Sequence, residues 1–181
     1  MENPVSFGNA YHTAKQLGLT YRQRLNYNEL DTLCKIMHNK PSYIEVGVYD
    51  GLSAFIIGMC TKASNMTLID INITEKAYKC SNFLTSVGID VQTICCDALK
   101  AEIGYHSWCM LDADHSYKST KECYEYYKNL AGVVVLHDIE MPGPKQLLEE
   151  IGGIKILSTE TNLLSPDGKR LPELGYGIAF S

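Results

Sequence analysis

Short apolar runs alternate along this chain with segments whose apolar residues recur at helical spacing. The runs predict seven strands, at residues 42–46, 66–71, 90–95, 107–111, 132–136, 154–157 and 175–180. The segments between them predict helices over residues 52–61, 75–87, 119–130 and 144–151, and an earlier helix is expected over residues 28–38. Strands that alternate with helices are typical of a parallel sheet covered on both faces.

The last two predicted strands break this alternation. A polar loop with turn residues at 165–168 lies between them in place of a helix, so we expect an antiparallel hairpin at one edge of the sheet. The expected fold class is α/β: a Rossmann-like three-layer sandwich with a seven-stranded, mostly parallel sheet and an antiparallel last strand. The length fits a single domain, residues 1–181, in which residues 1–41 form N-terminal helices and residues 42–181 form the core.

The composition disfavours several classes of function. With a formal net charge of −5 and no basic run longer than the pair Lys169 and Arg170, the chain has no electrostatic footprint for nucleic acid. No apolar stretch reaches the roughly 20 residues of a membrane span, and the first residues do not resemble a secretory signal. The seven cysteines form no C-x-x-C pair and no zinc spacing, which predicts reduced thiols in a cytoplasmic protein.

The most informative motif is a glycine turn at the end of the first predicted strand. Glu45, Gly47 and Gly51 follow the pattern Glu-x-Gly-x-x-x-Gly, and an apolar helix begins directly after it. Gly47 lets the backbone pass close to a ligand, and Gly51 permits a tight entry into the helix. A dinucleotide site needs a third glycine, in G-x-G-x-x-G, to seat a pyrophosphate at the helix N-terminus, and this turn lacks it.

The turn resembles the first motif of the class I S-adenosylmethionine (SAM) dependent methyltransferases. The expected sheet is similar to that family's sheet as well, with six parallel strands and one reversed strand. The resemblance implies that Glu45, Gly47 and Gly51 hold SAM and that residues 42–181 are a SAM-binding core. An ordinary strand–turn–helix of another α/β protein is the alternative interpretation of the turn.

Acidic residues follow the carboxyl ends of the predicted strands, where open α/β sheets bind ligands. Asp70 lies at the end of the second strand, and a carboxylate there can accept both hydroxyls of a ribose in a SAM or an NAD site. Asp97 follows the third strand and resembles the family's acid that contacts the adenine amino group, with Ala98 lining the adenine. For both aspartates, the alternative role is to cap the next helix.

A second motif follows the fourth and fifth strands. The fourth strand leads into Asp112, Asp114 and His115, and the fifth leads into His137 and Asp138. This arrangement resembles small-molecule O-methyltransferases, both the catechol and caffeoyl-coenzyme A type and the type that acts on sugars and antibiotics. In those families the first Asp and an acid after strand five hold a divalent metal. The resemblance implies Asp112 and Asp138 as metal ligands, and His115 in the place of the catalytic Lys, so that Asp112 and His115 are the candidate catalytic residues.

Methyl transfer explains why these residue types are needed. The reaction is an in-line displacement on a sulfonium carbon, and the attacking hydroxyl must lose its proton. A hard cation such as Mg²⁺ on carboxylate oxygens lowers the pKa of that hydroxyl, and a histidine with a pKa near neutrality can take the proton.

The resemblance has one gap at the metal site. Ile139 stands where the catechol-type enzymes have a ligating Asn. His137 is the candidate replacement ligand, which favours Mn²⁺, Fe²⁺ or Zn²⁺ over Mg²⁺. In the alternative without a metal, His115 or His137 is the base alone.

The sequence therefore predicts a SAM-dependent methyltransferase, favouring an O-methyltransferase whose acceptor is a small molecule such as a phenol, a sugar or a secondary metabolite. Neither nucleic acid nor a membrane is an expected partner. Because only residues 1–41 precede the first strand, the substrate side is open, closed by the N-terminal helices, or completed by a second subunit of a homo-oligomer. Two other functions stay open: a non-catalytic SAM-binding or assembly protein, and an NAD-linked oxidoreductase, which the glycine spacing disfavours.

Overall fold

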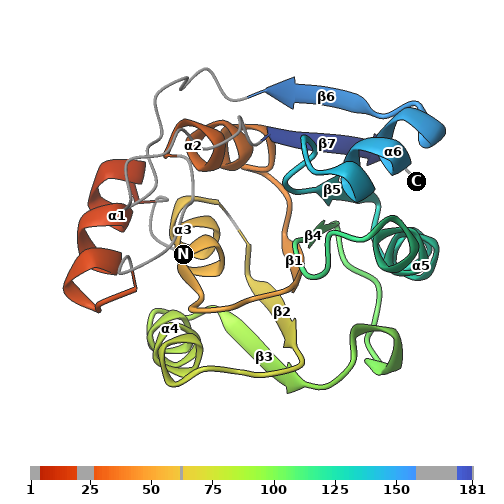
Figure 1. The fold of residues 1–181 in the computed structure, drawn as a ribbon. Coiled ribbons are helices and arrows are strands. Elements are labelled where there is room, and N and C mark those ends of the chain that lie inside the picture. The colour runs from red at the N-terminus through yellow and green to blue at the C-terminus, as the bar shows by residue number, and fades with distance from the viewer. Residues whose placement is uncertain (1–4, 20–26, 62, 158–174, 181) are drawn as a thin grey trace, which may run out of the picture.

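The computed structural model describes residues 5–19, 27–61, 63–157 and 175–180. In these ranges, one sheet contains the strands β1 (Ser42–Val46), β2 (Asn65–Asp70), β3 (Asp90–Cys95), β4 (Trp108–Leu111), β5 (Val133–Leu136), β6 (Ile154–Leu157) and β7 (Gly175–Phe180). Their order is β3-β2-β1-β4-β5-β7-β6, from the lower edge of the sheet in Figure 1 to the upper one. Neighbouring strands from β3 to β5 are parallel, whereas β7 is antiparallel to both β5 and β6.

Helices cover both faces of this sheet. The described α-helices are α1 (Phe7–Gln16), α2 (Tyr27–Ile36), α3 (Leu52–Cys60), α4 (Glu75–Ser86), α5 (Tyr117–Tyr127) and α6 (Pro142–Ile151), and a short 3-10 helix, η1 (Ala98–Lys100), follows β3. Helices α1 to α4 pack on one face, and α5 and α6 pack on the other (Figure 1). The Rossmann-like α/β class predicted from the sequence is thus confirmed. Among the described helices, none has both the length and the apolar character that crossing a membrane requires.

The elements lie within a few residues of their predicted positions. Helix α5 begins at Tyr117, two residues earlier than expected, because the Ser116 side chain accepts a hydrogen bond from the amide of Ser119 and caps the helix. Helix α6 likewise begins early, at Pro142, because a proline at the first helical position has no amide hydrogen to leave unpaired. The polar loop at residues 165–168, expected between the last two strands, lies outside the described residues.

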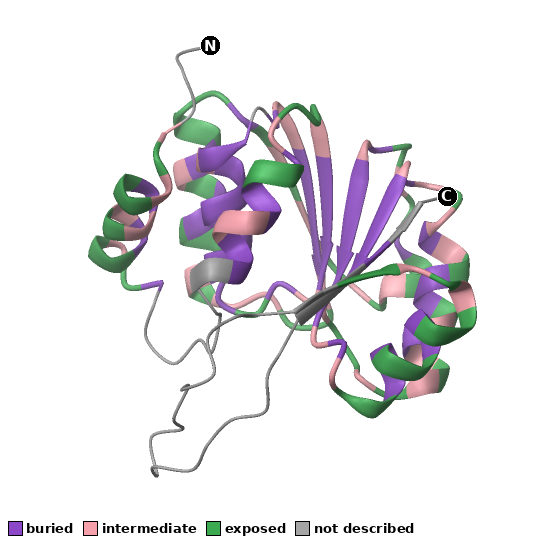
Figure 2. Cartoon of the chain, turned by 90° about the horizontal axis from the view of Figure 1, so that it is seen from above, coloured by how far each residue is buried: buried purple, intermediate pink, exposed green. Residues whose placement is uncertain are grey.

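The core consists of two apolar clusters, one on each face of the sheet. The central strands are buried along most of their length, as the purple strands between the helices in Figure 2 show. On one face, Phe55 of α3 belongs to a cluster in which the rings of Tyr43 and Trp108 stack at 4.1 Å between centroids. On the other face, Tyr127 of α5 and Leu147 of α6 cover the sheet. Helix α3 is buried almost all round because α1, α2 and α4 pack against it, which explains its uniformly apolar sequence.

The backbone crosses itself closely at the carboxyl end of β1. Gly47 has a φ of 91°, and a Cβ atom at this position would lie 2.1 Å from the carbonyl oxygen of Asp112. The amide of Gly47 donates to the carbonyl of Ile69 (2.9 Å), and the amide of Asp112 donates to the carbonyl of Val46 (2.8 Å). The chain leaving β1 is therefore held between the ends of β2 and β4, in a space that fits only glycine.

We predict that Gly47→Ala lowers the free energy of unfolding by more than Gly88→Ala does. Gly88 has nearly the same backbone angle, with a φ of 94°, but a Cβ atom there would meet nothing within 4 Å. Gly88→Ala should therefore cost about 1–2 kcal/mol from conformational strain alone, whereas the added backbone clash should bring the cost of Gly47→Ala above about 4 kcal/mol. Urea unfolding of both variants measures the difference, and equal losses would contradict the tight crossing.

Candidate functional site

A cavity of about 490 Å³ opens at the carboxyl ends of β1, β2 and β4, which is within the size range of small-molecule sites. Its walls come from the turn after β1, the end of β2, the segment from the end of β3 into η1, the loop after β4, and α5. The structure brings together five residues predicted from the sequence on these walls: Gly47, Asp70, Asp97, Ala98 and Asp112. The strand-end residues thus do converge on one cavity.

The charged side chains on the cavity wall are all acidic. Asp70, Asp97, Asp112 and Asp114 line it, and none of the described lining residues is Lys, Arg or His. Most of the other lining residues are apolar. A pyrophosphate would meet four carboxylates with no basic side chain among the described lining residues, although Lys100 lies 3.9 Å from Asp97 and His137 lies 3.0 Å from Asp112. A positively charged ligand would be attracted. The cavity therefore favours a cationic ligand with apolar surface over a dinucleotide.

Asp70 holds the turn after β1 from the tip of β2. Its Oδ2 accepts hydrogen bonds from the amides of Val48 (2.8 Å) and Tyr49 (3.0 Å), and its Oδ1 accepts one from the amide of Asn72 (2.9 Å). Helix α4 is capped by Thr74, so Asp70 does not have the capping role that was its alternative. A carboxylate offers about four acceptor positions, which leaves capacity at Asp70 for a ligand hydroxyl.

Asp97 has the capping role that was its alternative, and it also lies where a ligand could reach it. Its Oδ1 accepts a hydrogen bond from the amide of Leu99 (3.0 Å), so it caps η1. The same residue lies on the cavity wall, next to Ala98. The capping bond uses one oxygen of the carboxylate, so the cap and a place on the cavity wall are compatible.

Glu45 and Gly51 are the two predicted binding residues that do not line the cavity. Glu45 is fully buried, and its carboxylate accepts hydrogen bonds from the hydroxyls of Tyr43 (2.6 Å) and Ser53. Burial raises the pKa of Glu45 from 4.5 to about 8, although these two hydrogen bonds act in the opposite direction. Gly51 is the N-cap of α3, with a φ of 81°, and packs against Cys80. Both residues therefore support the turn after β1 from the side that faces away from the cavity.

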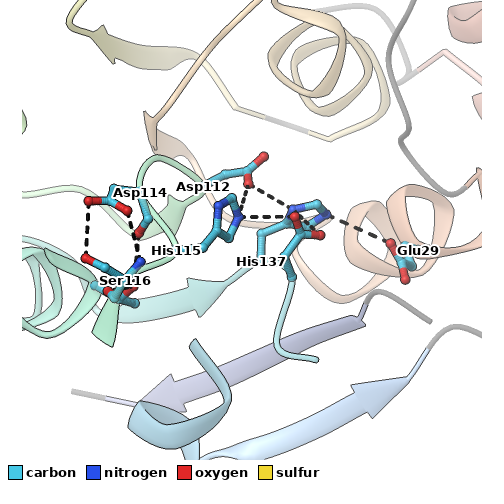
Figure 3. A network of polar contacts seen from close by, with 8 residues as sticks. Glu29, Asp112, Asp114, His115, Ser116 and His137 are labelled. Atoms are coloured by element: carbon cyan, nitrogen blue, oxygen red, sulfur yellow. Dashed lines mark hydrogen bonds and ion pairs between the residues drawn. The ribbon is translucent and has the colours of Figure 1, made fainter. Parts of the chain in front are cut away.

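A second group of predicted residues lies beside the cavity, at the ends of β4 and β5 (Figure 3). We call Asp112, His115, His137 and Asp138 the acid–histidine centre. Nε2 of His115 lies 3.1 Å from Oδ2 of Asp138 and 3.5 Å from Oδ1 of Asp112. Nδ1 of His137 lies 3.0 Å from Oδ1 of Asp112 and 3.2 Å from Oδ1 of Asp138. Each imidazole therefore faces both carboxylates, and Asp112 connects the centre to the cavity wall.

These contacts change the protonation expected for the two histidines. The carboxylates of Asp112 and Asp138 raise the pKa of His115 to about 10. Burial lowers the pKa of His137, but the charge of Asp112 and the hydrogen bond to it outweigh burial and raise the pKa to about 9. Burial raises the pKa of Asp112, but the charge of His137 and the contacts with both histidines lower it to about 2. At neutral pH both imidazoles hold a proton, which differs from the near-neutral base expected from the sequence.

The geometry of the centre suits a divalent cation. One ligand atom each from Asp112, His115 and Asp138 lie within 4.8 Å of one another, and together they could surround one ion. Oδ1 of Asp138 is buried and makes no hydrogen bond within the described part of the chain. Two carboxylates and one imidazole are a common donor set for divalent metals. This set contains His115, whereas His137, the replacement ligand suggested by the sequence, is not part of it.

Two residues at the site have an unusual backbone conformation. Asp138 has a φ of 51° and Tyr49 a φ of 49°, and they are the non-glycine residues with positive φ in the described ranges. Tyr49 lies on the cavity wall, and Asp138 belongs to the acid–histidine centre. Conformations of this kind persist where the surroundings hold them, often at ligand sites.

Glu29 of α2 is a member of the site that the sequence analysis missed. Its side chain is buried, and its Oε2 lies 3.9 Å from Nε2 of His137 (Figure 3). One signal was present in the pattern: Glu29 shares a helix face with Leu33, four residues later, so an acid stands on the apolar side of a predicted helix.

No family model matches this sequence, and no curated protein matches it. Solved structures resemble it. An O-methyltransferase from Bacillus cereus, in complex with S-adenosylhomocysteine, has a TM-score of 0.65 at 10% identity, over 97% of this chain and 90% of its own. An O-methyltransferase of tomaymycin synthesis from Streptomyces achromogenes, in complex with SAM, has a TM-score of 0.62 at 13% identity, over 99% of this chain and 90% of its own.

A third neighbour is the N-methyltransferase NodS from Bradyrhizobium japonicum, in complex with S-adenosylhomocysteine. It has a TM-score of 0.59 at 13% identity, over 94% of this chain and 97% of its own. This chain has the fold of SAM-dependent methyltransferases. Because the neighbours include O- and N-methyltransferases, the methyltransferase fold does not by itself select the acceptor atom.

We predict that Glu45→Gln flattens the pH dependence of stability. The folded protein holds the Glu45 proton up to about pH 8, whereas the unfolded chain releases it near pH 4.5, so raising the pH between these values favours unfolding. Because of this residue, the wild type should lose on the order of 4 kcal/mol of unfolding free energy across the window. Glu45→Gln cannot titrate and should lose none of it. Urea unfolding at both ends of the window measures the effect, and parallel pH profiles for the two proteins would contradict it.

Proposed function

We propose that this protein transfers the methyl group of SAM to a hydroxyl oxygen of a small molecule. The observation that carries the proposal is the acidic cavity at the carboxyl ends of β1, β2 and β4 of a methyltransferase fold. SAM is positively charged at its sulfonium and at its amino group and negatively charged at its carboxylate, so its net charge is positive and four aspartates attract it. Its adenosyl group has apolar surface that the remaining wall can cover.

Four residues are proposed to contact SAM directly. Gly47 lets the turn approach the ligand because it has no side chain. Asp70 accepts a hydrogen bond from the ribose with the acceptor capacity that its backbone contacts leave. Asp97 and Ala98 face the adenine from the start of η1. These assignments are supported by the cavity and by the resemblance of the motifs.

Two further residues are proposed to support the turn after β1 without contacting SAM. Glu45 joins β1 to α3 through its hydroxyl partners, and Gly51 sets the entry into α3. In this proposal residues 42–181 form the SAM-binding core, and residues 1–41 belong to the same single domain of residues 1–181.

The acid–histidine centre is the proposed catalytic group, because Asp112 borders the cavity. When bound, SAM supplies a methyl group on a sulfonium, and a divalent cation such as Mg²⁺ lowers the pKa of a hydroxyl beside it. Asp112, Asp138 and His115 are the proposed ligands of that cation. Nε2 of His115 faces both carboxylates, so this nitrogen would have to be free of its proton to hold a cation together with them. Without a metal, the same nitrogen is the proposed acceptor of the hydroxyl proton. His137 keeps its proton and orients both carboxylates.

The two rival functions fit the site less well. An NAD-linked oxidoreductase would place a pyrophosphate among four aspartates with no basic residue among the described lining residues, at a turn without the third glycine. A non-catalytic SAM-binding or assembly protein would not need the acid–histidine centre. Burying two carboxylates and two imidazoles together costs folding free energy. A functional role of the centre would explain why the protein bears this cost.

The proposal extends to partners and location. We propose a small-molecule acceptor, without nucleic acid or membrane partners, because the net charge is −5. The seven cysteines are all free, which fits the reducing cytoplasm. The acceptor side of the cavity is then open, closed by the N-terminal helices, or completed by a second subunit of a homo-oligomer.

We predict that Asp70→Ala weakens SAM binding at least about tenfold, whereas His115→Ala leaves it within about twofold while abolishing turnover. Asp70→Ala removes an acceptor on the cavity wall and releases two amides of the turn, whereas His115 does not line the cavity. Calorimetric titration of SAM into each variant measures the affinities. His12→Ala, at an exposed position of α1, is the matched control for loss of a histidine.

The SAM titrations distinguish a binding role from a catalytic role. Loss of SAM binding in His115→Ala would contradict its catalytic role. A wild-type protein that binds NAD and not SAM would contradict the proposed function as a whole.

A further inference from the structure

The two acids of α2 have opposite surroundings. Asp31 is partly exposed and pairs with Lys35, one turn later on the same helix, at 2.6 Å. Glu29 is 3% exposed and points toward the sheet, where its Oε2 lies 3.9 Å from Nε2 of His137 (Figure 3). This distance is that of an ion pair rather than of a hydrogen bond. Because both side chains are shielded from water, their attraction is stronger than that of a surface pair.

His137 connects this buried acid to the acid–histidine centre. Nδ1 of the ring faces Asp112 at 3.0 Å and Asp138 at 3.2 Å, and Nε2 on the opposite edge faces Glu29. Carboxylates from α2, from the end of β4 and from the end of β5 therefore surround a single buried ring. A planar imidazole directs one nitrogen to each of these two sides in one orientation only.

We propose that Glu29 is a positioning residue that holds the His137 ring with Nδ1 toward Asp112 and Asp138, and thereby holds these two carboxylates in place. The N-terminal helix α2 is then part of the functional site rather than only a cover for the sheet. The link to metal binding and catalysis rests on the proposed function, whereas the orientation of the ring does not.

A packing role alone would not call for an acid at this position. A buried carboxylate is unfavourable by several kcal/mol unless it is paired. Leu30 and Leu33 of the same helix are buried as well, so α2 already contributes apolar side chains to this layer. A leucine at position 29 would fill a similar volume without the cost of burying a charge. The pairing with His137 is what distinguishes Glu29 from these neighbours.

The test compares Glu29→Ala and Glu29→Gln with Asp31→Asn, which removes the same charge from the same helix outside the core. Crystal structures of the variants and the wild type report the orientation of the His137 ring. Calorimetric titrations with Mn²⁺ and with SAM report the acid–histidine centre and the cavity separately.

In Glu29→Ala we expect the His137 ring to turn, so that its 3.0 Å contact with Asp112 is lost. Mn²⁺ affinity should fall about 10- to 100-fold, as for other residues that orient metal ligands, while SAM affinity stays within about twofold. Glu29→Gln keeps the size and a polar contact, so its Mn²⁺ affinity should lie between those of Glu29→Ala and the wild type. Asp31→Asn should match the wild type.

An unmoved His137 ring in Glu29→Ala would overturn the inference, and so would a turned ring with unchanged Mn²⁺ affinity. Equal losses in Asp31→Asn would also overturn it, because they would reflect the charge of the helix alone. If Glu29→Ala does not fold, Glu29→Gln decides on the same readouts. If the wild type binds neither SAM nor Mn²⁺, the proposed function fails, and the ring orientation alone decides the role of Glu29.

Discussion

The gathering of carboxylates at one edge of the sheet is the constraint on which the rest of the site depends. Parallel strands direct their carboxyl ends to the same edge, so Asp70, Asp97, Asp112 and Asp138 come together. The negative charge of each carboxylate is partly compensated. Backbone amides donate hydrogen bonds to Asp70 and Asp97, and protonated histidines lie beside Asp112 and Asp138. The acids that border the cavity are therefore held in place, and they attract a ligand of positive charge.

The crossing at Gly47 brings the two parts of the site into direct contact. The carbonyl of Asp112 occupies the space that a side chain at position 47 would need. The turn proposed to hold the cofactor is therefore in direct backbone contact with the loop after β4, which carries Asp112 and His115 of the acid–histidine centre. Methyl transfer depends on an in-line approach of the acceptor oxygen to the methyl carbon. Contact between the turn after β1 and the loop after β4 would help to hold the cofactor and the acceptor in that alignment.

The sequence predicted the fold and the cavity well because both follow from local patterns. Strand ends can be located from apolar runs, and residues just beyond them, such as Asp70 and Asp97, necessarily reach the edge of the sheet. Glu45 was a different case: it lies within β1, so its side chain points from the face of the sheet into the core. The raised pKa of His115 and the role of Glu29 depend on distances between segments far apart in the chain, which no local pattern contains.

A crystal structure with S-adenosylhomocysteine, the product that SAM becomes after transfer, would show whether this cavity holds the cofactor. We expect adenosine between Asp70 and Asp97, with the sulfur of the homocysteine directed toward Asp112 and the acid–histidine centre. An empty cavity at saturating ligand, or ligand bound in the separate cavity beside Cys34 and Cys60, would show that the cavity at the ends of β1, β2 and β4 is not the cofactor site.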